Sequence, residues 1–198
     1  SSADIAAACM AAALYAGRKL TYEDIASIAL SIEPTDAIFY PGIVMFDHLQ
    51  GQRCNYLGKP PLLKVAIFDT GNEVDTMKFN QRSDLKMLNI KKEQQVRRAV
   101  HFVQEGLLKG DCNLIGKGAT LSALANQSIL FKPCLQTVID LLPKLGAVGV
   151  NVAHSGTVIG VLSAGDCNLA SLSLLQKYCK ELTFMYLARV ITGGLEVV

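Results

Sequence analysis

Hydrophobic positions recur with two different periods along the chain, and each period predicts one kind of element. Between Lys91 and Lys109 they recur every three to four residues, which is the spacing of one helix face. From Leu62 to Thr70 they form an almost unbroken run, which is typical of a buried strand. The predicted helices cover residues 3–16, 21–32, 91–109, 111–126, 132–145 and 168–179, and the predicted strands cover 43–48, 62–70, 146–153, 157–164 and 182–191.

The order of the later elements predicts the fold class. It runs strand, helices, two strands joined by a short turn, helix and strand, which favours an α+β fold with helices on one face of an antiparallel sheet. The earlier part resembles the helical remainder of a second α/β layer. Gly51, Gly58, Pro60 and Pro61 cluster between the two parts. We therefore expect two domains, covering residues 1–60 and 61–198.

Composition and charge exclude several classes of protein. Hydrophobic residues make up 51% of the 198 positions and charged residues 18%, which is a globular composition. The net charge is only +2, with no basic cluster beyond a short helical run, so we expect no nucleic-acid partner. No apolar run reaches membrane-spanning length, so we expect no membrane association. None of the six cysteines forms a Cys-x-x-Cys pair, which favours free thiols in a reducing cytoplasm over a zinc site.

The first candidate site is the opening stretch, SSADIAAACMAAALYAG. Alanines predict a helix, Ser2 is a good N-cap, and Asp4 in the first turn suits the helix dipole. The start of a helix can also hold a phosphate, and serine hydroxyls there can bind phosphate or Mg²⁺. An ordinary capped helix explains the same residues. No glycine precedes Ser1, so we expect a shortened chain that has lost a glycine-rich segment.

The second candidate site is Glu33-Pro34-Thr35-Asp36, which follows the second predicted helix. Pro34 ends the helix and holds two carboxylates close together. Such a pair can divide metal binding and proton abstraction between its members. A helix stop with solvated acids is the alternative interpretation.

The third candidate site is the turn His154-Ser155-Gly156-Thr157 between two predicted strands. Its backbone N–H groups can form an anion-binding nest, although a plain hairpin turn explains the pattern as well. His154 is interpreted as a turn or wall residue and not as a catalytic base. We expect His48 and His101 to be structural.

These three motifs, in this order, resemble those of the GHMP small-molecule kinases. The stretches SSADIAAA, SIEPTDAIFYPGIVMFDH and VAIFDTGNEVDT are most similar to the branch that phosphorylates L-threonine in cobalamin synthesis. The resemblance implies a GHMP-kinase-like fold. Residues 1–60 would be the remainder of an N-terminal nucleotide-binding domain, and residues 61–198 would form a ferredoxin-like α/β sandwich.

The resemblance also implies roles for single residues, with ATP and Mg²⁺ as cofactors. Asp36 matches the family acid that orients or deprotonates the acceptor hydroxyl, which makes it the implied catalytic residue. The implied ATP contacts are Ser1, Ser2, Ala3, Ser155 and Gly156, the implied Mg²⁺ ligands are Ser2, Asp4 and Glu33, and the implied substrate contacts are Thr35 and His154.

The activity implied is transfer of a phosphoryl group from ATP to a small amino-acid alcohol, most closely L-threonine. Homoserine or another small alcohol stays open as the acceptor, and so does a non-catalytic binding or regulatory protein of the same fold. We expect the 198-residue chain to be inactive by itself and its longer parent to be active. An apolar surface exposed by the lost layer favours a homodimer.

Overall fold

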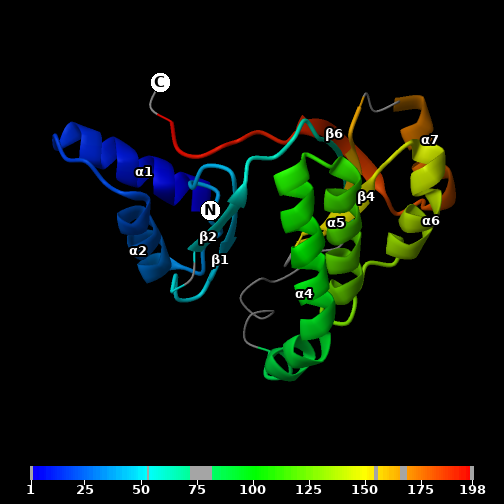
Figure 1. Cartoon of the computed structure of the whole chain (residues 1–198), viewed down its shortest axis with the longest axis horizontal. Coiled ribbons are helices and arrows are strands. Elements are labelled where there is room, and N and C mark those ends of the chain that lie inside the picture. The colour runs from blue at the N-terminus through cyan, green and yellow to red at the C-terminus, as the bar shows by residue number, and fades with distance from the viewer. Residues whose placement is uncertain (1, 53, 72–81, 154–155, 166–168, 197–198) are drawn as a thin grey trace. The chain divides into compact units, whose positions relative to one another are not determined.

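The chain folds into two units (Figure 1). In this computed structural model the first unit comprises residues 1–60 together with the tail from Ile191 onward, and the second comprises Pro61–Val190. The structure describes residues 2–52, 54–71, 82–153, 156–165 and 169–196. The tail was assigned to the second domain from the sequence, but it lies with the first unit, where the Leu195 N–H donates to the Phe39 carbonyl at 3.1 Å.

Two helices and one hairpin make up the described part of the first unit. The helices are α1 (Ser2–Tyr15) and α2 (Tyr22–Ile32), and the antiparallel strands are β1 (Ile43–Phe46) and β2 (Cys54–Gly58). Helix α2 begins where its sequence predicts, because Thr21 and Asp24 form a capping box. The Asp24 N–H donates to Thr21 Oγ1 at 3.1 Å, and the Thr21 N–H donates to Asp24 Oδ2 at 2.8 Å.

The small core of the first unit joins these elements. Phe39 and Tyr40 precede β1 and pack with their ring centroids 5.1 Å apart. Ala6 of α1 is 1% exposed, which shows how the alanine-rich face lets α1 approach its neighbours closely. The buried cluster consists of Ala6, Ile25, Ala26, Phe39 and Tyr40.

The second unit is built on a four-stranded antiparallel sheet. Its strands are β3 (Lys64–Asp69), β4 (Gly149–Val152), β5 (Val158–Ser163) and β6 (Thr183–Arg189), in the spatial order β4-β5-β3-β6. Helices α4 (Leu85–Lys109), α5 (Cys112–Asn126) and α6 (Leu135–Leu145) lie between β3 and β4 in the chain, and α7 (Leu169–Tyr178) lies between β5 and β6. This connectivity is the expected ferredoxin-like sandwich.

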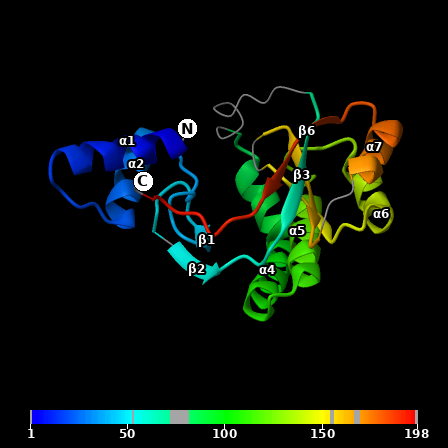
Figure 2. The same ribbon diagram turned by 90° about the horizontal axis from the view of Figure 1, so that it is seen from above.

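One face of the sheet carries the main core. Alternate residues of β3 and β5, such as Phe68 and Ile159, have no exposed surface and contact side chains of α6 and α7. Helices α6 and α7 lie side by side in both views (Figures 1 and 2). Helix α6 supplies Leu135, Val138, Leu141, Leu142 and Leu145 to this core. Among the described residues, no helix has the length and apolarity needed to cross a membrane.

Glycines bring helix α5 into backbone contact on two sides. A Cβ placed on Gly116 would lie under 3.0 Å from the Val148 carbonyl, just before β4. A Cβ on Gly118 would also lie under 3.0 Å from the Ala99 carbonyl of α4, and one on Gly106 of α4 would lie under 3.0 Å from Ile115. Helix α4 therefore runs directly alongside α5 (Figure 1), and α5 lies directly against the edge of β4.

Candidate functional site

The first two sequence motifs meet at the start of helix α1. The Asp36 N–H donates a hydrogen bond to Ser2 Oγ at 3.0 Å, although the two residues are 34 positions apart. This bond places the backbone of the acidic motif directly beside the N-terminal end of α1. Ser1 lies outside the described residues, so the opening motif is described from Ser2 onward.

The segment that carries Asp36 is held from two sides. Glu33 caps α2 in an extended conformation and donates its N–H to the Ala29 carbonyl at 3.0 Å. The Thr35 N–H donates to the His48 carbonyl at 3.1 Å, in the turn that follows β1. Thr35 is 1% exposed, so its side chain anchors the segment inside the first unit. This bond uses only the backbone of His48, so the structural role expected of its side chain stays a prediction.

The side chains that the resemblance implicates in chemistry lie on the surface of the first unit. Ala3, Asp4, Glu33 and Asp36 are all exposed, and Ser2 is partly buried. The first N–H groups of a helix have no acceptor within the helix and give that end a partial positive charge, which stabilises a nearby anion. The arrangement therefore combines an anion-binding helix end with accessible carboxylates.

The third motif lies in the second unit, where its end is firmly held. Its first two residues, His154 and Ser155, lie outside the described residues, so the expectations for them stay predictions. The Ala153 N–H donates to the Val158 carbonyl at 3.0 Å and closes the hairpin. The Gly156 carbonyl accepts a hydrogen bond from Lys132 Nζ. No sequence signal predicts this role for Lys132, because Lys132-Pro133 indicates only the start of a helix.

Strand β3 ends beside the same turn. The Thr70 hydroxyl donates to the Thr157 carbonyl at 2.9 Å. Hydrogen bonds from the Thr157 side chain and the Gly71 N–H hold the pKa of Asp69 below its usual value. Burial lowers the pKa of Lys132, and the negative charge of Asp69 partly opposes that effect. A hydrogen-bonded polar cluster thus forms where β3, β5 and the segment before α6 converge.

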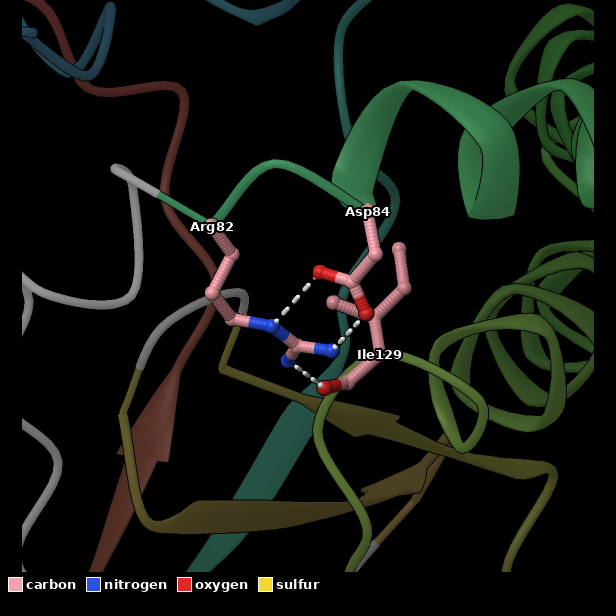
Figure 3. A network of polar contacts seen from close by, with 3 residues as sticks. All are labelled: Arg82, Asp84 and Ile129. Atoms are coloured by element: carbon pink, nitrogen blue, oxygen red, sulfur yellow. Dashed lines mark hydrogen bonds and ion pairs between the residues drawn. The ribbon is translucent and has the colours of Figure 1, made fainter.

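The side chain of Arg82 connects the segment before α6 to the start of α4 (Figure 3). Arg82 Nε and Nη2 donate to the two oxygens of Asp84 at 3.0 and 2.8 Å, and Nη1 donates to the Ile129 carbonyl at 2.7 Å. Gln127 adds two more bonds, accepting the Lys132 N–H at 2.7 Å and donating to the Lys132 carbonyl at 3.0 Å. The backbone around Lys132 is therefore held at several points.

Two curated relatives match the whole chain. An L-threonine kinase of Citrobacter freundii is 31% identical over 100% of this chain and 69% of its own length. An L-threonine kinase of Salmonella typhimurium is 29% identical over 100% of this chain and 67% of its own length. The chain therefore spans about two thirds of these relatives. No protein-family model matches it.

Solved structures of kinases share the fold. Leishmania major mevalonate kinase, in complex with R-mevalonate, superposes with a TM-score of 0.66 at 19% identity, over 95% of this chain and 63% of that one. Homoserine kinase of Cytophaga hutchinsonii superposes with a TM-score of 0.60 at 18% identity, over 92% of this chain and 62% of that one. Streptococcus pneumoniae phosphomevalonate kinase, in complex with phosphomevalonate and AMPPNP, superposes with a TM-score of 0.63 at 13% identity. The superposition covers 91% of this chain and 65% of that one. The chain spans less than two thirds of each.

The order of motifs, the ferredoxin-like second unit and these similarities define one class of protein, the small-molecule kinases. The chain belongs to the GHMP kinase family and, within it, is similar to the two L-threonine kinases described above.

Proposed function

We propose that the protein transfers the terminal phosphoryl group of ATP to the hydroxyl of L-threonine, giving O-phospho-L-threonine and ADP. The two relatives named L-threonine kinase support the acceptor, and the AMPPNP complex of a structural neighbour supports ATP as the donor. The structural observation that carries the proposal is the hydrogen bond from the Asp36 N–H to Ser2 Oγ at 3.0 Å. It brings the backbone of an exposed aspartate beside the start of α1, and the start of a helix favours a nearby anion.

The proposed reaction is an in-line displacement. The acceptor hydroxyl oxygen forms a bond to the γ-phosphorus, the bond from that phosphorus to its bridging oxygen breaks, and ADP leaves. Asp36 orients the hydroxyl and takes its proton. An aspartate is a weak base, but it accepts the proton late in a loose transition state, so high basicity is not needed.

Charge neutralisation is assigned to the start of α1. Its N–H groups, including that of Ala3, and the Ser2 hydroxyl face the phosphates in this proposal. Ser155 and Gly156 of the third motif would add further contacts to ATP, and Thr35 and His154 would contact the acceptor.

Three residues at the start of α1 and after α2 carry donors of the kind that a magnesium ion takes, while the described residues contain no cluster of three or more Asp, Glu, His or Cys side chains that could hold a metal ion. Ser2, Asp4 and Glu33 offer hydroxyl and carboxylate oxygens, which are the donors that Mg²⁺ prefers. Ser2 Oγ accepts one N–H, and a hydroxyl oxygen has a second lone pair, so its contact with Asp36 leaves room for a metal. When bound, the metal would supply charge neutralisation at the phosphates.

The test is an ADP-release assay of the protein expressed from its complete gene, with L-threonine, L-serine and homoserine as acceptors. We expect the highest kcat/KM with L-threonine and a loss of at least about 100-fold in kcat for Asp36→Asn. The matched control is Asp140→Asn, because Asp140 is an exposed aspartate on α6 and should leave kcat unchanged. Equal activity of Asp36→Asn and the control would remove Asp36 from the mechanism.

The same assay separates the alternatives. A preference for homoserine or another alcohol would keep the kinase and replace the acceptor. No turnover with any acceptor, together with intact binding of AMPPNP, would favour the non-catalytic binding protein.

A homodimer and a cytoplasmic location belong to this proposal as well. Among the described residues the cysteines Cys9, Cys54, Cys112, Cys134 and Cys179 are free thiols, as a reducing compartment requires. Sedimentation of the complete protein as a monomer would count against the dimer.

A further inference from the structure

Lys132 is a buried charged residue outside the three motifs. It is 2% exposed, and lysines are almost never so buried without a partner. The Gly156 carbonyl accepts a hydrogen bond from its Nζ, and the negative charge of Asp69 also acts on this ammonium group. The bonds between its own backbone and the Gln127 side chain, at 2.7 and 3.0 Å, hold the base of the lysine in place. Its ammonium group therefore holds one peptide group of the third motif by a hydrogen bond, near the carboxylate of Asp69.

A second side chain holds the next peptide group of the same motif. The Thr70 hydroxyl donates to the Thr157 carbonyl at 2.9 Å, and the Thr70 N–H approaches the same oxygen at 3.4 Å. Thr70 is 7% exposed and follows directly after β3. Two consecutive carbonyls, those of Gly156 and Thr157, are thus held by buried side chains from distant parts of the second unit.

This arrangement fixes the direction of a backbone N–H group. No peptide bond in the described structure is cis, and in a trans peptide the C=O and the following N–H point in opposite directions. Because the Gly156 carbonyl faces the buried Lys132, the Thr157 N–H faces away from the lysine. A backbone donor that is held in a fixed direction contributes to binding an anion without first having to be ordered.

We propose that Lys132 and Thr70 are positioning residues that orient the Gly156–Thr157 peptide groups of the third motif for phosphoryl transfer. The inference rests on the proposed function. Neither residue needs to touch a reactant, because each acts through a carbonyl of the turn. A direct contact of Lys132 with a reactant is the competing explanation, and the comparison of the two residues separates them.

The kinetic test compares Lys132→Met with Thr70→Val in the protein expressed from its complete gene. We call the Lys132 contact with the Gly156 carbonyl and the Thr70 contact with the Thr157 carbonyl the two clamps of the turn. Each variant removes one clamp, so each should lower kcat/KM by about 10- to 100-fold, as misplacement by about 1 Å does. The double variant should lose much less than the product of the two single losses, because both act through one element. Thr70→Ser keeps the hydroxyl and should restore most of the activity.

Two control variants remove similar groups from the same unit without touching the turn. Lys117→Met removes a lysine whose Nζ lies 4.1 Å from the centre of the Phe102 ring. Thr120→Val removes a hydroxyl that donates to the Gly116 carbonyl at 2.8 Å and accepts from the Val150 N–H at 3.1 Å. We expect Thr120→Val to lower the melting temperature as much as Thr70→Val does, with kcat/KM within about twofold of the wild type. If the two controls lose as much kcat/KM as Lys132→Met and Thr70→Val do, the contacts of Lys132 and Thr70 only stabilise the fold, and the inference is overturned.

Amide hydrogen exchange at Thr157 and Val158 gives a readout that does not require activity. Both clamp variants should accelerate exchange at these amides, and the two controls should not. Unchanged exchange would overturn the clamp, and faster exchange with unchanged kinetics would overturn its role in the reaction. If Lys132→Met lowers kcat/KM and Thr70→Val does not, the positioning role is wrong and Lys132 contacts a reactant directly. If the wild type phosphorylates none of the acceptors, the proposed function fails, and the exchange data still decide whether the clamp exists.

Discussion

Replacing Gly116 by alanine tests the close packing of α5 against the edge of the sheet. The added Cβ would lie under 3.0 Å from the carbon and oxygen of the Val148 carbonyl. Both are backbone atoms, so no side-chain rotation can make room, and the helix must move away from the residues that lead into β4. The closeness of helix and strand thus depends on the missing side chain of Gly116.

The expected size of the effect is the difference of two terms. Overpacking against rigid neighbours costs up to about 3 kcal/mol. Exchanging glycine for alanine within a helix returns about 1 kcal/mol. The net loss is therefore about 2 kcal/mol, and with a urea m-value of about 2 kcal/mol/M the unfolding midpoint should fall by about 1 M.

The assay is urea unfolding followed by far-ultraviolet circular dichroism, with Gly165→Ala as the matched control. Gly165 lies in the same unit, and a Cβ there meets nothing within 4 Å. We expect its midpoint to stay the same or to rise slightly, because alanine reduces the entropy of the unfolded chain. Equal midpoints for Gly116→Ala and Gly165→Ala would refute the steric reasoning.

Three smaller predictions concern single contacts. Thr21→Ala removes the hydroxyl of the capping box and should cost about 1 kcal/mol in urea unfolding, and an unchanged midpoint would show that α2 does not need this cap. Asp69 has a lowered pKa in the folded state, so it contributes stability above its usual pKa of 3.8 that is lost as the pH falls through the lowered value. Asp69→Asn should flatten stability against pH in this acid range, and a curve identical to that of the wild type would contradict the prediction. Arg82→Met should accelerate amide exchange in the first turn of α4, because it breaks the bonds to Asp84 and to the Ile129 carbonyl (Figure 3), and unchanged exchange would mean that this network does not hold the helix start.

Elements with local signals were predictable from the sequence. Helix α2 starts at its capping box, α5 starts after Asp111, whose carboxylate accepts the Asn113 N–H at 2.8 Å, and α4 ends at Gly110 with φ +64°. Each of these signals involves residues at most four positions apart, so the sequence contains the complete cause.

Elements that depend on distant partners were missed or shortened. Strand β2 (Cys54–Gly58) was not predicted, because its residues are mostly exposed and its conformation comes from pairing with β1. Helix α4 begins at Leu85 and not near Lys91, so it starts within the polar stretch 72–89 for which the sequence predicts a loop. The bond from Arg82 to the Ile129 carbonyl, 47 positions away, holds the chain just before that start.

In the candidate site, too, features with a local sequence signal were predictable and features that depend on distant residues were not. The family resemblance predicts that Ser2 and Asp36 belong to one site, and the fold shows that the Asp36 N–H donates to Ser2 Oγ; their roles in that site stay a prediction. Lys132 carried no signal, because a single lysine before a proline normally lies in solvent. Its burial follows from a carbonyl 24 positions later, which no local pattern contains.

The glycine contacts of α5 also limit how the second unit can move. Where main chain meets main chain, no layer of side chains remains that could slide or repack, so shear between α4, α5 and β4 is blocked. Strand β4 of the β4–β5 hairpin begins directly after this rigid contact. A movement of these three elements must therefore come from hinges in the segments that connect them to the rest of the second unit, and helix α5 should move with β4 as a single body.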